Sequence, residues 1–216
     1  MKKHIVCFGD SNTHGYCADP ADCADGGIRF NESERWTCLL QEKLGEDYLV
    51  TEEGLSGRTT VFDDPLYEGL SGLSYITPCL KSHEFVDLLI IMLGTNDTKD
   101  RFAANATGIG RGMERLVRKA YATDCWGPNK PNVLVIAPPP IQKGMLTSEV
   151  AGEMGKYCVE ISEGLAAEYR KQCELLGAHF LDAAHCEFNQ VDYMHLTKKG
   201  HETLAETLAQ LVPTLL

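Results

Sequence analysis

The sequence has no Cys-x-x-Cys pair, no run of Lys or Arg longer than two residues and no long apolar segment. The nine cysteines are spread from Cys7 to Cys186 in a chain large enough to form its own core. We therefore expect free thiols in a reducing cytoplasm rather than a disulfide scaffold. The longest unbroken apolar run, Leu88 to Leu93, is far below the roughly 20 residues of a membrane-spanning helix. The run that follows Met1-Lys2-Lys3 ends at Phe8, too early for a signal peptide, so we expect no membrane partner.

Basic charge is also scarce. The 216 residues carry 20 Lys and Arg against 31 Asp and Glu, a formal net charge of −11. This balance repels phosphate backbones, so nucleic acid is not an expected partner. A hydrophobic content of 44% with 24% charged residues is typical of a globular protein, and the length predicts one domain over residues 1–216.

The usual signatures of cofactor binding are missing. There is no G-x-G-x-x-G and no G-x-x-x-x-G-K-[ST] motif for phosphate groups. His-Glu-x-x-His is absent, and the seven histidines form no close pair on one helical face. We expect neither an organic cofactor nor a metal.

Short apolar runs alternate along the chain with segments of helical periodicity, which predicts repeated strand-helix units. The expected strands are His4–Phe8, Tyr48–Glu52, Val86–Leu93, Asn132–Ala137 and His179–Asp182. Apolar stripes predict helices over 36–44, 109–120, 150–173 and 204–211. The expected fold is a three-layer α/β/α sandwich, flavodoxin-like, around a five-stranded parallel sheet of order 2-1-3-4-5.

In that order the chain changes direction between the first and third strands, and ligands bind beyond the carboxyl ends of these two strands. The residues at these ends are Gly9-Asp10-Ser11-Asn12 and Gly94-Thr95-Asn96-Asp97. Acyl transfer needs a nucleophile, a base, a group that orients the base and donors for the oxyanion. Ser11 is the candidate nucleophile and Asn96 a candidate donor, so the chemistry is expected at this edge.

The remaining groups come from elsewhere in the chain. Asp192 and His195 lie three residues apart before the last helix, a spacing that lets the carboxylate reach one ring nitrogen while the other faces outward. The backbone N–H groups of Ser11 and Gly57 are further candidate oxyanion donors. Asp10 and Asp97 are expected to hold loops through backbone N–H groups, and Arg58 to pair with Asp63 or Asp64 or to face solvent.

Four blocks of the sequence resemble, in order, those of the SGNH (GDSL) hydrolases. They are Gly9-Asp10-Ser11-Asn12, Leu55-Ser56-Gly57-Arg58-Thr59-Thr60, Gly94-Thr95-Asn96-Asp97 and Asp192-Tyr193-Met194-His195. The resemblance implies a serine esterase with Ser11 as nucleophile, His195 as base and Asp192 as its orienting carboxylate. It implies an oxyanion hole of the Ser11 and Gly57 N–H groups and the Asn96 amide.

The sequence is more closely similar to the bacterial arylesterase or perhydrolase branch of that family. This rests on Glu52 to Ser56, Asp63-Asp64-Pro65, Ile90 to Lys99 and Ala137-Pro138-Pro139-Pro140. Residue 14 is His where that branch usually has Trp, which argues against acyl transfer to acceptors other than water. Members of the branch tend to form oligomers, so the resemblance implies a homo-oligomer.

The expected substrate is a small carboxylic ester with a short-chain acyl or aryl group. His14 and Pro139 are candidates for the substrate pocket. A carbohydrate O-acetylesterase is the alternative, favoured by His14 and the acidic segment 17–27, and an inactive binding protein is a more remote one. Cys17 and Cys23 share that polar segment, which suggests a redox-sensitive pair.

Overall fold

The computed structural model describes residues 1–216, and its centre is one five-stranded parallel sheet. The strands run in the order β2-β1-β3-β4-β5, as the sequence predicts. Their bounds are β1 (Lys3–Gly9), β2 (Tyr48–Gly54), β3 (Leu88–Met92), β4 (Val133–Ala137) and β5 (His179–Asp182). The central strand β3 and its neighbour β4 are apolar and buried along their whole length, because helices cover both faces of the sheet.

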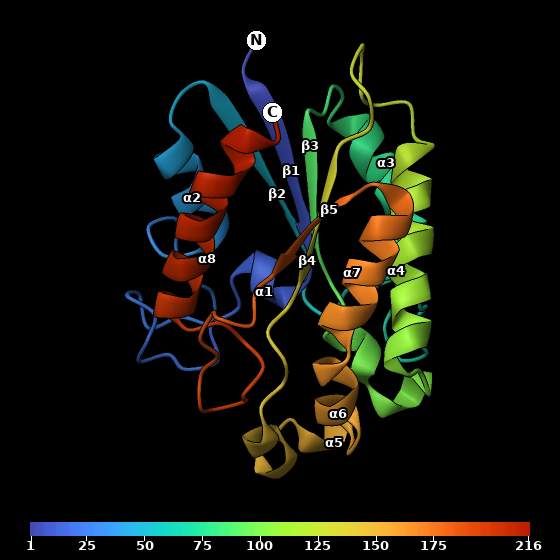
Figure 1. Ribbon diagram of the computed structural model, residues 1–216. Helices are drawn as coiled ribbons and strands as arrows, with labels where there is room; N and C mark the ends of the chain where they lie inside the picture. The colour runs from blue at the N-terminus through green and yellow to red at the C-terminus, as the bar shows by residue number, and fades with distance from the viewer.

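Two groups of helices cover the sheet (Figure 1). One face is covered by α2 (Trp36–Leu44) and α8 (Lys198–Leu211), and the other by α3 (Gly72–Ser82), α4 (Ala106–Tyr121) and α7 (Leu165–Leu176). Side chains of β1 alternate between the two cores: Ile5 and Cys7 belong to the first, Val6 and Phe8 to the second. The predicted three-layer sandwich is confirmed.

One helical prediction needs correction, and one helix was not predicted. The stripe over 150–173 predicts one helix, but the structure has three: α5 (Ala151–Met154), α6 (Cys158–Glu163) and α7. Gly155 ends α5 with φ +85°, and a Cβ there would overlap the Asp100 side chain, so the chain turns instead of continuing. Helix α3 was not predicted, because Pro78 lies within it.

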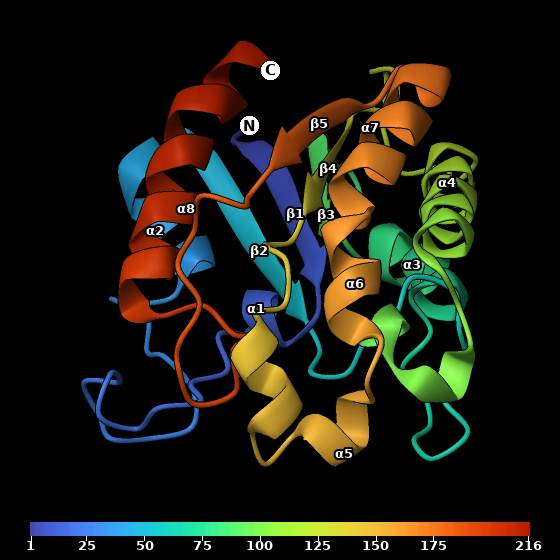
Figure 2. The ribbon, with the colours of Figure 1, turned by 60° about the horizontal axis from the view of Figure 1, so that its bottom comes forward.

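Short elements gather beyond the carboxyl ends of the strands, as Figure 2 shows for α1 and α5. Helix α1 (Ser11–His14) follows β1 after one residue, and the 3₁₀ turn η1 (Asn96–Thr98) follows β3. Further 3₁₀ turns at this end are η2 (Asp100–Phe102) and η3 (Lys143–Thr147), whereas η4 (Val212–Thr214) follows α8 at the opposite end of the sheet (Figure 1). The first and third strands thus deliver Ser11 and Asn96 to the same edge of the sheet. None of the helices has the length and apolar character that spanning a membrane requires.

Candidate active site

Ser11 is the first residue of α1 and is held there by a tight turn. Asp10 caps the helix: its Oδ1 accepts a hydrogen bond from the Asn12 N–H at 3.0 Å. Gly9 lets the chain approach itself, because a Cβ at this position would overlap the Thr13 side chain and the Met92 carbonyl. The hydroxyl of Ser11 is therefore fixed immediately beyond the end of β1.

Ser11, His195 and Asp192 form one chain of hydrogen bonds. The Ser11 Oγ lies 2.8 Å from His195 Nε2, and His195 Nδ1 lies 2.6 Å from Asp192 Oδ2. Burial opposes ionisation of Asp192, but hydrogen bonds from His195 and Asn189 hold the pKa of its carboxyl below the ordinary value. The carboxylate is thus kept charged beside the ring, which favours a proton on Nδ1 and a free Nε2 facing the serine.

The imidazole is also held from two other sides. The Tyr16 ring packs against the His195 ring, with centroids 4.6 Å apart. The buried Asn12 side chain donates to the Met194 carbonyl at 3.1 Å and accepts from the Leu196 N–H at 2.9 Å, on either side of His195. Sequence analysis assigned no role to these two residues, and no local motif distinguishes them, because each acts on a residue far along the chain.

The candidate oxyanion donors lie around the same hydroxyl. Ser11, Gly57, Asn96 and His195 all line a cavity of about 160 Å³. Gly57 has φ +87°, which a residue with a side chain adopts only under strain. The Asn96 amide donates to the Arg58 carbonyl at 3.2 Å and lies 3.5 Å from Asp10 Oδ2. Four of the five residues predicted for the reaction therefore meet at one cavity, and Asp192 lies behind them.

The two residues suggested for the substrate pocket are placed differently. The lining of the cavity includes neither His14 nor Pro139. His14 ends α1, and its carbonyl accepts from the Arg29 Nε at 2.8 Å. Pro139 is buried just beyond β4. The cavity is lined instead by Tyr16, Ser56, Lys99, Glu153, Met154 and Met194 together with the four residues above.

Two buried carboxyl groups support the loops, as expected. Asp97 accepts the Thr60 N–H at 2.9 and 3.1 Å and also the Thr60 hydroxyl, which ties η1 to the loop after β2. Burial raises the pKa of both Asp10 and Asp97 to about 6. Asp10 and Asp97, which were expected to support the backbone, thus lie close to the reaction centre without contacting Ser11 Oγ.

The expectation for Arg58 is wrong, because its side chain is buried and pairs with neither Asp63 nor Asp64. Its Nη1 donates to the Gly9 carbonyl at 2.9 Å and also to the Glu53 carbonyl, and its guanidinium lies 4.2 Å above the Phe8 ring. Asp64 lies instead beside Arg101, at 3.7 Å. Arg58 therefore ties the ends of β1 and β2 to the loop that carries Gly57.

The mouth of the cavity combines charge with aromatic surface. Lys99, only 6% exposed, pairs with Glu153 at 3.1 Å. Beyond them the cavity continues into a groove of about 920 Å³, which Leu66, Tyr67, Glu68 and Leu70 line together with Tyr16, Ser56, Gly57, Lys99 and Glu153. Sequence analysis missed Lys99 and Glu153 as pocket residues, because only the fold brings them together.

Cys17 and Cys23 are both free and buried, and they form a small apolar cluster with Phe30. The Cys17 Sγ donates to the Asp19 carbonyl at 2.9 Å, and burial raises the pKa of its thiol to about 12. Such a thiol is weakly reactive. The redox-sensitive pair stays a prediction.

A serine hydroxyl bonded to an imidazole that is bonded to a carboxylate, with amide donors at the same cavity, is the geometry of a serine hydrolase. Residues 7–203 match the model of the GDSL-like lipase/acylhydrolase family. The chain belongs to this family, which has the SGNH hydrolase fold, and it is a carboxylic ester hydrolase.

Solved structures agree with this assignment. The chain is 36% identical to the aryl esterase of M. smegmatis, with a TM-score of 0.88 over 99% of this chain and all of that one. It is 34% identical to a carbohydrate acetylesterase from Sinorhizobium meliloti, with a TM-score of 0.87 over 100% of both chains. For a putative arylesterase from Agrobacterium tumefaciens the identity is 32% and the TM-score 0.84, over 99% of this chain and 100% of that one. No curated protein sequence matches the chain.

Proposed function

We propose that the protein hydrolyses small carboxylic esters, with short-chain acyl or aryl groups, through an acyl-enzyme on Ser11. The observation that carries the proposal is the continuous hydrogen-bonded chain from Ser11 Oγ through His195 to Asp192, with separations of 2.8 and 2.6 Å. Both distances lie within the reach that proton transfer needs. Family membership gives the reaction class. The hydrogen bonds from Ser11 through His195 to Asp192 support the roles of nucleophile, base and orienting carboxylate that we propose for these residues.

The reaction proceeds in two halves. Ser11 Oγ attacks the ester carbonyl while its proton passes to His195 Nε2, and the tetrahedral intermediate collapses as the imidazolium returns that proton to the departing alcohol. Water then loses a proton to the same nitrogen, attacks the acyl-enzyme and releases the acid and free Ser11. Asp192 accepts from Nδ1 throughout, so it fixes the ring and stabilises the imidazolium.

Three donors are assigned to the oxyanion: the backbone N–H groups of Ser11 and Gly57 and the side-chain amide of Asn96. Support comes from their common position at the 160 Å³ cavity. The Asn96 amide has two hydrogens, of which the Arg58 carbonyl takes one at 3.2 Å. The second makes only a long contact of 3.5 Å with Asp10 Oδ2, and we assign it to the developing negative charge on the substrate oxygen, which would replace that contact.

The size of the cavity supports a short acyl group. Its volume of about 160 Å³ is well below the roughly 300–1,000 Å³ of pockets that enclose drug-sized ligands. Met154 and Met194 give it an apolar wall, which suits a small alkyl or aryl acyl chain. A long acyl chain would have to lie in the wider groove, whose lining includes the charged residues Lys99 and Glu153.

A specific feature favours the alternative, a carbohydrate O-acetylesterase. The groove that leaves the cavity is bordered by the Lys99–Glu153 ion pair and by Tyr16 and Tyr67. Charged hydrogen-bonding groups beside aromatic rings suit a polar alcohol such as a sugar. The S. meliloti neighbour is named a carbohydrate acetylesterase, which gives this alternative further support.

One experiment tests both. Hydrolysis of p-nitrophenyl acetate, butyrate and octanoate is measured beside acetylated xylobiose, with wild type, Ser11→Ala and the exposed control Ser33→Ala. We expect activity that falls with chain length, persists in Ser33→Ala and drops by several orders of magnitude in Ser11→Ala. Preference for the sugar acetate would select the alternative. A folded Ser11→Ala protein with wild-type activity would overturn the acyl-enzyme, and a folded wild type without activity would favour a binding protein.

The homo-oligomer stays a prediction from the resemblance. Light scattering at assay concentration measures it directly. A mass equal to that of a single chain would contradict it.

A further inference from the structure

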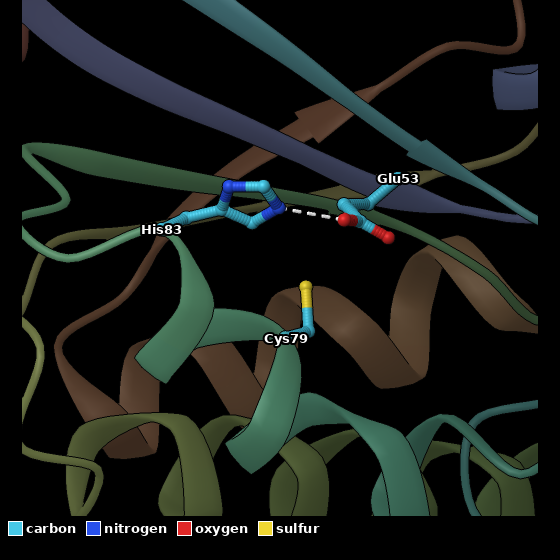
Figure 3. Close-up of side chains that lie close together, drawn as sticks. All are labelled: Glu53, Cys79 and His83. Atoms are coloured by element: carbon cyan, nitrogen blue, oxygen red, sulfur yellow. Dashed lines mark hydrogen bonds and ion pairs between the residues drawn. The ribbon is translucent and has the colours of Figure 1, made fainter.

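Three potential metal ligands lie together between the edge strand β2 and helix α3. Glu53 is the penultimate residue of β2, Cys79 lies in α3 and His83 follows the last residue of that helix. His83 lies four positions after Cys79, so both side chains lie on the same side of α3. Figure 3 shows the thiol of Cys79 pointing toward the pair formed by His83 and Glu53.

The donor atoms are already close. His83 Nε2 lies 2.6 Å from Glu53 Oε1, and the nitrogen, sulfur and carboxylate oxygen all lie within 4.8 Å of one another. Around a tetrahedral zinc ion, ligand atoms of these three kinds are separated by roughly 3.3–3.8 Å, given bond lengths of about 2.0–2.3 Å. Side-chain rotations that bring the sulfur closer by at most about 1 to 1.5 Å and open the His83–Glu53 pair would therefore complete the geometry.

We propose that Glu53, Cys79 and His83 form a binding site for a divalent transition-metal ion of the zinc class. Imidazole, thiolate and carboxylate are the three ligand types that zinc takes from proteins. A hydrogen-bonded His–Glu pair alone is a common structural feature. The thiol aimed at that pair adds a soft third donor, which neither magnesium nor calcium would use.

The charge balance of binding can be written out. Burial, together with the charge of Glu53, raises the pKa of Cys79 to about 12, so the thiol is neutral without the ion. Binding forms bonds from the metal to Sγ, Nε2 and a Glu53 oxygen, the hydrogen that Nε2 shares with Glu53 moves to Nδ1 of the neutral imidazole, and the thiol proton is released to solvent. The ligand set then carries two negative charges, which the ion balances. The guanidinium of Arg58 lies nearby, bonded to the Glu53 carbonyl, and its positive charge limits affinity.

The proposed site is partly open to solvent. The His83 and Glu53 side chains are 25% and 18% exposed, while Cys79 is buried beneath them. Three protein ligands leave the fourth position to water or another small donor. None of the three residues lines the cavity at Ser11. The proposal therefore does not depend on the esterase reaction.

The sequence contains no histidine pair with the spacing of a metal site. This site uses one histidine, a cysteine one helical turn before it and a carboxylate about 26 residues earlier in the chain. Only the packing of α3 beside the end of β2 brings Glu53 to the other two.

Cobalt(II) titration of the reduced, metal-free full-length chain tests the proposal. A tetrahedral site with a thiolate gives visible d–d bands and a near-ultraviolet sulfur-to-cobalt charge-transfer band. We expect both to saturate at one equivalent and to be displaced by zinc. Cys79→Ser removes the charge-transfer band, and His83→Gln weakens binding by more than about 10-fold.

Cys38→Ser is the control, because Cys38 is a half-buried thiol that, like the buried Cys79, lies beside a carboxylate, that of Glu52, but is not part of the cluster. It is expected to bind cobalt as wild type does. Circular dichroism and p-nitrophenyl acetate hydrolysis by Cys79→Ser show whether that variant is folded, and His83→Gln tests the site if it is not. A wild type without the bands, bands that persist in folded Cys79→Ser, or bands lost in Cys38→Ser would each overturn the proposal.

Discussion

Asn12 holds the backbone on both sides of His195. Its amide donates to the Met194 carbonyl at 3.1 Å, and its carbonyl oxygen accepts from the Leu196 N–H at 2.9 Å. Because Asn12 directly follows Ser11, the residue next to the nucleophile fixes the loop that carries the proposed base. The hydrogen bond between Ser11 and His195 thus depends on contacts that join opposite ends of the chain.

Replacement of Asn12 by Ala should therefore slow turnover with little effect on KM. Loss of the amide frees the His195 loop, and we expect kcat to fall by about 10–100-fold through misplacement of the imidazole. It also leaves the buried Met194 carbonyl and Leu196 N–H without partners, which costs about 1–3 kcal/mol of unfolding free energy. Steady-state kinetics and urea unfolding measure the two effects, with the exposed Asn129→Ala as control. A variant with wild-type kcat would contradict the positioning role.

Replacement of Asn96 should have a different effect, because its amide is proposed to donate to the oxyanion that forms in the transition state. Asn96→Ala should lower kcat by about 10²–10³-fold for every ester that wild type hydrolyses, with KM nearly unchanged. Asn96→Asp should be no better, since a carboxylate repels the oxyanion. Kinetics on p-nitrophenyl acetate measure both variants. Unchanged turnover in Asn96→Ala would remove this residue from the oxyanion hole.

The sequence predicts the sheet order and the meeting of Ser11 with Asn96, because both residues directly follow apolar strands of a parallel sheet. Asp192 and His195 are predictable because their spacing is local. The roles of Asn12 and Tyr16 are not, since each contacts a loop more than 170 residues away in sequence. Lys99 and Glu153 belong to the same group, because long-range packing alone makes them neighbours.

Two other predictions, the single helix over 150–173 and the partner of Arg58, were wrong for different reasons. The apolar stripe over 150–173 keeps a helical period across three helices, although Met154 of α5 and Cys158 of α6 belong to the core of α2 and α8 and Tyr169 of α7 to the core on the opposite face. Gly155 is the only strong sign of the first break. Arginine side chains are usually exposed, so the sequence favours a surface position for Arg58. Its burial depends on carbonyls at the ends of two strands and on the Phe8 ring, neither of which the local sequence specifies.

The buried carboxyl of Asp97 should make stability depend on pH. Its folded pKa is raised to about 6 from an ordinary value of 3.8, mainly by burial, so folding favours the protonated form. This contribution is fully present below about pH 4 and is lost as pH rises through about 6. Asp97→Asn removes the titration, so its unfolding free energy relative to wild type should rise by up to about 3 kcal/mol across that window. Urea unfolding at several pH values checks this, and a constant difference would contradict it.

The Lys99–Glu153 pair should decide how well the enzyme tolerates a polar alcohol. Lys99 borders both the cavity and the groove, so replacing it with Met removes a charged donor from the path of the substrate and adds apolar surface. We expect kcat/KM for acetylated xylobiose to fall by about 10-fold or more, because hydrogen bonds from charged groups contribute about 1.5–3 kcal/mol. The value for p-nitrophenyl butyrate should stay the same or rise. Lys143→Met, on η3 outside the lining of both spaces, is the matched control. Equal losses on the two esters would mean that Lys99 supports the fold of the mouth and does not select the alcohol.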